Sequence, residues 1–215
     1  MQKFKGALFD LDGTLFDTEP QYSVFWGGIA RRYHPDIPGL ENIIKGTTLT
    51  YILDTFFKDD ELQRVIIEQL DEFENNMEFP YVEGADSFLS DLKSHHVKCA
   101  IVTSSNQKKI LSLKNKVPNF DSMFDNVLTS EMFCKSKPDP ECYLKAAASF
   151  GFDLNECVVF EDSINGLKSG KKSGIYTVGL TTTKNAEEIK GLCDIVFPNF
   201  LNLTYEKMNN FLINN

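Results

Sequence analysis

Short apolar segments recur along the chain, separated by stretches with helical periodicity. The apolar segments are residues 6–9, 99–102, 126–128, 157–160, 175–178 and 195–197. Each is followed by polar or glycine-containing sequence. Short continuous apolar runs are typical of strands that are buried on both faces of a sheet. Their alternation with helices predicts right-handed βαβ units, and therefore an α/β fold with a doubly wound parallel sheet.

Two of the helices between these strands have clear end signals. Asp139-Pro140 predicts an N-cap and a proline in the first turn, and Gly151 predicts the end of that helix about three turns later. Ser163 predicts the N-cap of another helix, with Gly174 just beyond its last turn.

The stretch from residue 18 to residue 81 breaks the alternation because it contains no strand-like run. Its apolar residues recur at spacings of three and four, as in Leu62, Ile66 and Leu70. This pattern predicts an all-α insert at 18–81, within a core formed by residues 1–17 and 82–215. The insert leaves the sheet at the carboxyl end of the first strand, where open parallel sheets bind ligands. We therefore expect a cap over an active site.

The composition excludes several classes of protein. The chain has 215 residues, of which 42 % are apolar, and its 22 basic and 31 acidic residues give a formal charge of −9. This acidic balance, without a basic stripe, argues against nucleic-acid and membrane partners. No apolar run approaches the ~18 residues of a transmembrane helix. Five scattered cysteines without a C-x-x-C pair indicate reduced thiols, and hence a cytoplasmic protein.

The segment Phe9–Leu15, with the sequence F-D-L-D-G-T-L, is the most informative one for chemistry. Asp10 and Asp12 follow a predicted buried strand, and Gly13 permits a sharp turn after them. At strand spacing the two carboxylates point the same way. Two like charges this close are costly unless a cation or a reacting group uses them. The pair on its own is also compatible with a plain acidic turn.

Four segments together resemble the motifs of the haloacid dehalogenase-like phosphohydrolases. Asp10–Leu15 is similar to motif one, Thr103 at the end of a strand to motif two, and Lys137 before a proline to motif three. Glu161-Asp162, at the end of another strand, is similar to motif four. The run Glu161–Gly166 further resembles the subgroup with an α-helical cap, which includes β-phosphoglucomutase and many sugar-phosphate phosphatases. The resemblance covers the whole chain and implies a Rossmann-like core with an inserted cap, working as a monomer.

The resemblance also implies a Mg²⁺-dependent phosphatase that acts through an aspartyl-phosphate. Asp10 would be the nucleophile, and Asp12 would be the general acid for the leaving oxygen and then the base for water. Mg²⁺ would be bound by Asp10, by the backbone carbonyl of Asp12 and by Asp162. Glu161 would hold metal-bound water beside it.

Further residues would hold the phosphoryl group. The Thr103 hydroxyl and the Lys137 ammonium would contact it directly. Backbone N–H groups would complete the cradle, at Leu11, Asp12, Ser104 and Ser105. The sequence also allows simpler interpretations of these residues. Thr103 could be a strand-end residue, Lys137 a solvated loop lysine, and Ser104 and Ser105 residues that only form a turn.

Two cap positions differ from β-phosphoglucomutase. Tyr22 aligns with a histidine that serves phosphoryl transfer in the mutase, and Leu49 aligns with an arginine that binds the second phosphate. Residues 59–78 hold eight acidic residues and one basic residue, Arg64. We therefore expect a phosphatase of small phosphorylated metabolites, such as hexose or related sugar phosphates. The alternatives are a phosphomutase of the β-phosphoglucomutase type, then a pyrophosphatase or nucleotide phosphatase, and lastly a binding protein without catalysis.

Overall fold

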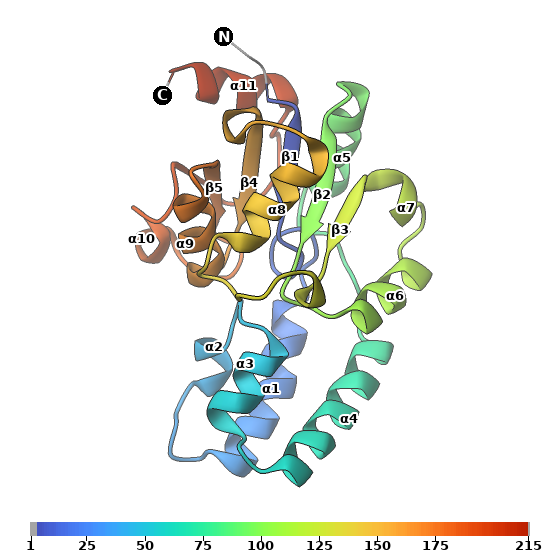
Figure 1. The fold of residues 1–215 in the computed structure, drawn as a ribbon, viewed down its shortest axis with the longest axis vertical. Helices are drawn as coiled ribbons and strands as arrows, with labels where there is room; N and C mark the ends of the chain where they lie inside the picture. The colour runs from blue at the N-terminus through green and yellow to red at the C-terminus, as the bar shows by residue number, and fades with distance from the viewer. Residues whose placement is uncertain (1–3, 215) are drawn as a thin grey trace.

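A computed structural model describes residues 4–214, which form a parallel sheet with helices on both faces and a group of helices at one end (Figure 1). The six strands have the order β3-β2-β1-β4-β5-β6, and all neighbouring pairs are parallel. They are β1 (Gly6–Phe9), β2 (Lys98–Val102), β3 (Asn126–Leu128), β4 (Cys157–Glu161), β5 (Tyr176–Leu180) and β6 (Ile195–Phe197). The predicted α/β class and the parallel sheet are confirmed, although β5 begins one residue later and ends two residues later than predicted.

The helices of the core follow the strands in the expected alternation. They are α5 (Ala85–Ser94), α6 (Gln107–Lys116), α7 (Phe120–Met123), α8 (Glu141–Phe150), α9 (Ile164–Ser173), α10 (Ala186–Ile189) and α11 (Tyr205–Asn214), with 3₁₀ turns η1 (Ser130–Met132) and η2 (Leu154–Glu156). Ser163 caps α9 as predicted, because its Oγ accepts a hydrogen bond from the Gly166 N–H at 3.0 Å. The predicted start of α8 is wrong by one residue. Pro140 is its N-cap, and Asp139 Oδ1 instead accepts from the Glu141 N–H at 3.1 Å.

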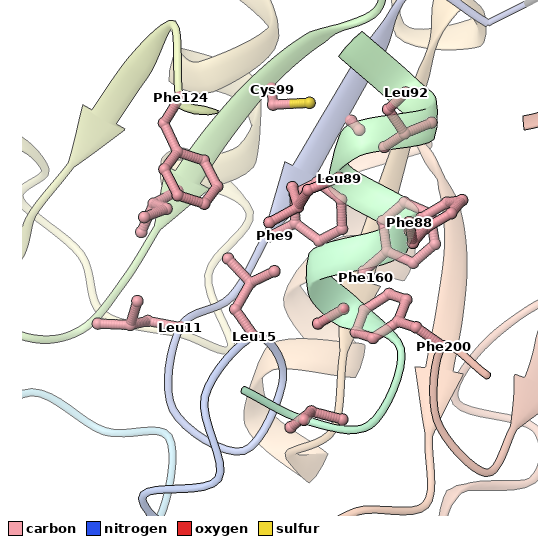
Figure 2. Close-up of a cluster of buried hydrophobic side chains, with 14 of the residues drawn as sticks. Phe9, Leu11, Leu15, Phe88, Leu89, Leu92, Cys99, Phe124, Phe160 and Phe200 are labelled. Atoms are coloured by element: carbon pink, nitrogen blue, oxygen red, sulfur yellow. The ribbon is translucent and has the colours of Figure 1, made fainter. Parts of the chain in front are cut away.

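Successive residues of β1 face two different hydrophobic cores, which explains its continuous apolar sequence. Phe9 belongs to the core beneath α5, and Leu8 belongs to the core beneath α8. Figure 2 shows the first core, where the rings of Phe9 and Phe160 stack at 4.7 Å between their centroids and Phe88 and Phe200 pack beside them. Each buried ring of this size stabilises the fold by about 1.5–3 kcal/mol. This packing holds the carboxyl ends of β1 and β4 side by side.

The segment between β1 and α5 is helical, as expected. It contains α1 (Glu19–Tyr33), α2 (Leu40–Ile43), α3 (Leu49–Phe56) and α4 (Asp60–Asn76), which lie beyond the tips of the strand arrows in Figure 1. These helices share a hydrophobic cluster of their own, which includes Trp26, Ile52 and Ile66. The two connections to the core run together, since the Asp17 N–H donates to the Pro80 carbonyl at 2.8 Å. The exact domain boundaries stay a prediction.

None of the helices within residues 4–214 combines the length and the hydrophobicity needed to span a membrane.

Candidate active site

The carboxyl ends of β1, β2 and β4 bring the four sequence motifs together. Phe9 pairs in register with Ile101 of β2 and with Phe160 of β4. The residues that follow these positions therefore meet at one edge of the sheet, and they include Asp10, Thr103 and Asp162. Lys137 reaches the same place from the loop between η1 and α8. All of these side chains are buried.

Lys137 is the centre of the buried charge cluster. Its ammonium donates to Asp10 Oδ1 at 2.5 Å, to Glu161 Oε1 at 2.7 Å and to the Val102 carbonyl at 3.0 Å. These three bonds use all three of its donors. Burial alone would lower the pKa of Lys137, but the carboxylates of Asp10 and Glu161 raise it above its ordinary value. A solvated loop lysine is therefore excluded at this position.

Three carboxyl groups crowd together beside Lys137. Asp10, Glu161 and Asp162 each offer an oxygen atom within 4.8 Å of the others. Burial raises the pKa of Asp10 to about 8, with Glu161 and Asp12 adding to the shift and Lys137 opposing it. Burial and the charges of Glu161 and Asp10 raise the pKa of Asp162 well above its ordinary value. Such a cluster favours a bound cation, which would neutralise the like charges.

The hydrogen bonds distinguish which carboxylates have room for a metal ion. Asp162 Oδ1 accepts from the Thr14 hydroxyl at 2.7 Å. Its Oδ2 is buried and has no well-aligned hydrogen bond from the described residues, although the nearby Thr183 hydroxyl interacts with this carboxyl group. At Gly13, whose φ is +80°, a Cβ atom would collide with this Oδ2. Only glycine therefore lets the loop after β1 lie against Asp162. Asp10 and Asp162 fit the oxygen ligands of a hard divalent cation.

Glu161, in contrast, already uses both of its oxygens. Its Oε1 accepts from Lys137 and from the Tyr143 hydroxyl at 2.9 Å. Its Oε2 accepts from the N–H groups of Asp162 and Ser163, both at 3.0 Å. These bonds fix the backbone that carries Asp162. The geometry therefore favours a positioning role for Glu161 over direct ligation.

Asp12 has a separate set of hydrogen-bond partners. The Thr18 hydroxyl donates to its Oδ1 at 2.5 Å, and the Ser105 hydroxyl donates to its Oδ2 at 3.0 Å. The Lys109 ammonium contacts both of its oxygens. Sequence reasoning missed Lys109. The one local signal was its place on the face of α6 that also carries the buried Leu113, four residues later.

The remaining phosphate-cradle residues lie near the site with different partners. The Ser105 N–H donates to Thr103 Oγ1 at 3.0 Å, and the Ser104 hydroxyl donates to the Gly46 carbonyl of the cap at 3.3 Å. The Leu11 side chain is buried in the core, so only its backbone can face a ligand. That these backbone groups bind phosphate stays a prediction.

A pocket of about 110 Å³ lies between the core and the cap. The core lines it with Asp10, Asp12, Thr103, Ser104 and Ser105, and the cap lines it with residues that include Tyr22, Trp26, Lys45, Leu49 and Glu74. Lys45 is paired with Glu19 at 2.9 Å between Nζ and Oε2. The Tyr22 hydroxyl donates to Glu74 Oε1 at 2.6 Å. The cap wall is thus apolar and acidic, and its lysine is already paired.

Comparisons with known proteins identify the family of this chain. A model of the haloacid dehalogenase-like hydrolase family matches residues 7–180. Validoxylamine A 7'-phosphate phosphatase from Streptomyces hygroscopicus subsp. limoneus is 28 % identical over 196 residues, which cover 86 % of this chain and 90 % of that protein. β-Phosphoglucomutase from Bacillus subtilis (strain 168) is 28 % identical over 193 residues, covering 82 % and 83 %. The crystal structure of a HAD hydrolase, family IA, variant 3, from Entamoeba histolytica superposes with a TM-score of 0.83 at 23 % identity, covering 98 % and 100 %.

The chain therefore belongs to the haloacid dehalogenase-like hydrolases, in the branch similar to β-phosphoglucomutase. It is an enzyme of the phosphatase class.

Proposed function

We propose that this protein is a Mg²⁺-dependent phosphatase of small sugar phosphates. The observation that carries the proposal is the buried group of Asp10, Lys137 and Asp162 at the sheet edge. Asp10 of this group also lines a pocket beneath an acidic cap. The phosphatase relative supports the same reaction class.

The reaction follows from the positions of Asp10 and Asp12. A carboxylate oxygen of Asp10 attacks phosphorus and the ester P–O bond breaks. Asp12, which must be protonated when the substrate is bound, gives its proton to the leaving oxygen. Asp12 then takes a proton from water, whose oxygen attacks the aspartyl-phosphate. The bond between Asp10 and phosphorus breaks, which releases phosphate and restores the free carboxylate. In both steps the Thr103 hydroxyl holds the phosphoryl group, and Lys137 exchanges one of its three hydrogen bonds for one to a phosphoryl oxygen.

The side chains of Asp10 and Asp162 and the backbone carbonyl of Asp12 would hold Mg²⁺. The ion would supply positive charge that offsets the charge of the phosphoryl oxygens. Glu161 holds the backbone of Asp162 in place through its bond from the Asp162 N–H.

The cap favours a monophosphate over a bisphosphate. Of the described residues that line the pocket, Lys45 is the one cationic side chain, and Glu19 already neutralises it. Leu49 and Tyr22 occupy the two positions where a mutase needs its arginine and histidine. A phosphomutase remains the second candidate because of the similarity to β-phosphoglucomutase.

A panel of phosphate esters tests the proposal. Purified enzyme is incubated with Mg²⁺ and with glucose 6-phosphate, sorbitol 6-phosphate, β-glucose 1-phosphate or p-nitrophenyl phosphate, and free phosphate is measured. We expect phosphate release that stops in EDTA and in the Asp10→Asn variant.

A coupled glucose-6-phosphate dehydrogenase assay tests for the mutase. Isomerisation of β-glucose 1-phosphate that outpaces phosphate release and needs glucose 1,6-bisphosphate would overturn the phosphatase proposal.

We also propose that the enzyme is a cytoplasmic monomer. All five cysteines are free, and burial raises the pKa of the Cys99 thiol to about 12, which keeps it unreactive. Light scattering on the purified protein would test the monomer, and a dimer mass would contradict it.

A further inference from the structure

Lys109 is a buried lysine that belongs to none of the four family motifs. It is the third residue of α6, and its side chain is 0 % exposed. Lysine is almost never fully buried unless its ammonium is paired. Its neighbour Lys108 has 73 % of its side chain exposed and pairs with Asp71 at the surface. The burial of Lys109 therefore reflects its particular partners.

Those partners converge on Asp12. The Lys109 ammonium contacts both carboxylate oxygens of Asp12 and donates to Ser105 Oγ at 3.1 Å. Ser105 and Thr18 also donate to Asp12. Both oxygens of this carboxylate are thus held by donors from two segments, one with Thr18 and one with Ser105 and Lys109. The bidentate contact of Lys109 is the one that restrains the two oxygens together.

The cap completes the surroundings of Lys109. The Tyr22 ring of α1 lies 4.5 Å from the ammonium, close enough for a cation–π interaction. The Tyr22 hydroxyl is in turn anchored by Glu74 of α4. Two cap helices and one core helix therefore enclose the lysine beside Asp12, away from bulk water.

We propose that Lys109 is a positioning residue that holds the Asp12 carboxylate in place for proton transfer to the leaving oxygen. This role rests on the proposed function of Asp12. Proton transfer requires the carboxylate within about 2.6–3.2 Å of the leaving oxygen. Displacement of a reacting group by about 1 Å can reduce a rate about a hundredfold. Without Lys109, the carboxylate would keep only two hydroxyl donors and could rotate away.

The test uses the dependence of the rate on the leaving group. An alkyl phosphate needs a proton on its leaving oxygen, whereas p-nitrophenolate leaves without one. The ratio of kcat/KM is measured for the fastest sugar phosphate of the panel over p-nitrophenyl phosphate. In Lys109→Met we expect this ratio to fall about tenfold or more, the effect of a lost charged hydrogen bond. Because both rates come from one preparation, the ratio does not depend on the fraction of enzyme that is folded.

Lys114→Met is the matched control, since Lys114 lies on the same helix and pairs with Asp121 at the surface. Its ratio should equal that of the wild type. Equal losses for both esters in Lys109→Met would indicate a merely structural role, and a higher ratio would show that Lys109 hinders the proton transfer. Either result overturns the inference and leaves the phosphatase proposal intact. A wild type that hydrolyses neither ester overturns both.

Discussion

Replacing Lys137 with methionine should destabilise the fold as well as abolish catalysis. The substitution keeps much of the side-chain volume and removes the charge that lies between Asp10 and Glu161. The two carboxylates would then remain buried without their counter-charge. Breaking a buried ion pair by removing one partner costs about 3–5 kcal/mol. At about 2–4 °C per kcal/mol for a protein of this size, Tm should fall by about 6–20 °C.

Circular dichroism during heating in EDTA at pH 9, where Asp10 with its pKa of about 8 is ionised, measures this loss. Lys145→Met is the matched control, because Lys145 pairs with Glu141 at the surface, where its side chain is 46 % exposed. Such a pair contributes about 0–1 kcal/mol. Adding Glu161→Gln to Lys137→Met should restore part of the stability, since it removes one of the two stranded charges. If Lys137→Met lost no more stability than Lys145→Met, the account of the charge cluster would be refuted.

Three further predictions follow from the site and the core. In a thermal-shift titration, Mg²⁺ should raise the Tm of the wild type because it binds the folded state, and Asp162→Ala should show no such rise. An equal rise in Tm for both proteins would mean that Asp162 is not a metal ligand. In EDTA, the pKa of Asp10 is raised from 3.8 to about 8 in the folded state, so between these pH values the folded state binds one more proton than the unfolded state. The stability that Asp10 contributes through this proton is therefore complete below about pH 4 and is lost as the pH rises to about 8. Urea unfolding at several pH values should show a smaller decline for Asp10→Asn, and an unchanged decline would contradict the shift. Phe88→Ala should cost about 3–5 kcal/mol in urea unfolding, and a loss below about 1 kcal/mol would show that the core around Phe9 collapses without penalty.

The sheet and the motif residues could be predicted because local sequence determines both. Strands buried on two faces are apolar throughout, as in 157–160, and parallel strands place the residues that follow them at one edge. The sequence alone therefore predicts that Asp10, Thr103 and Asp162 lie at the same edge of the sheet. The start of α8 was misplaced by one residue because Asp139 and Pro140 offer competing ends.

Other features of the site depend on contacts between distant segments. In the sequence, Lys108 and Lys109 are equivalent, and only packing against Asp12 and Tyr22 separates the surface lysine from the buried one. Likewise, the sequence assigns Glu161 to metal-bound water. It could not show that donors occupy both oxygens of Glu161, because one of these donors, the Tyr143 hydroxyl, comes from α8.

The central claim is that Asp10 becomes phosphorylated during turnover. Enzyme mixed with p-nitrophenyl phosphate and Mg²⁺ is quenched within one turnover and treated with borohydride, which reduces an acyl phosphate of aspartate to homoserine. Peptide mass spectrometry then locates the modified residue. Homoserine should appear at position 10 in the wild type and should be absent from Asp10→Asn. Homoserine at another aspartate, or phosphate release with no trapped acyl phosphate, would contradict the central claim.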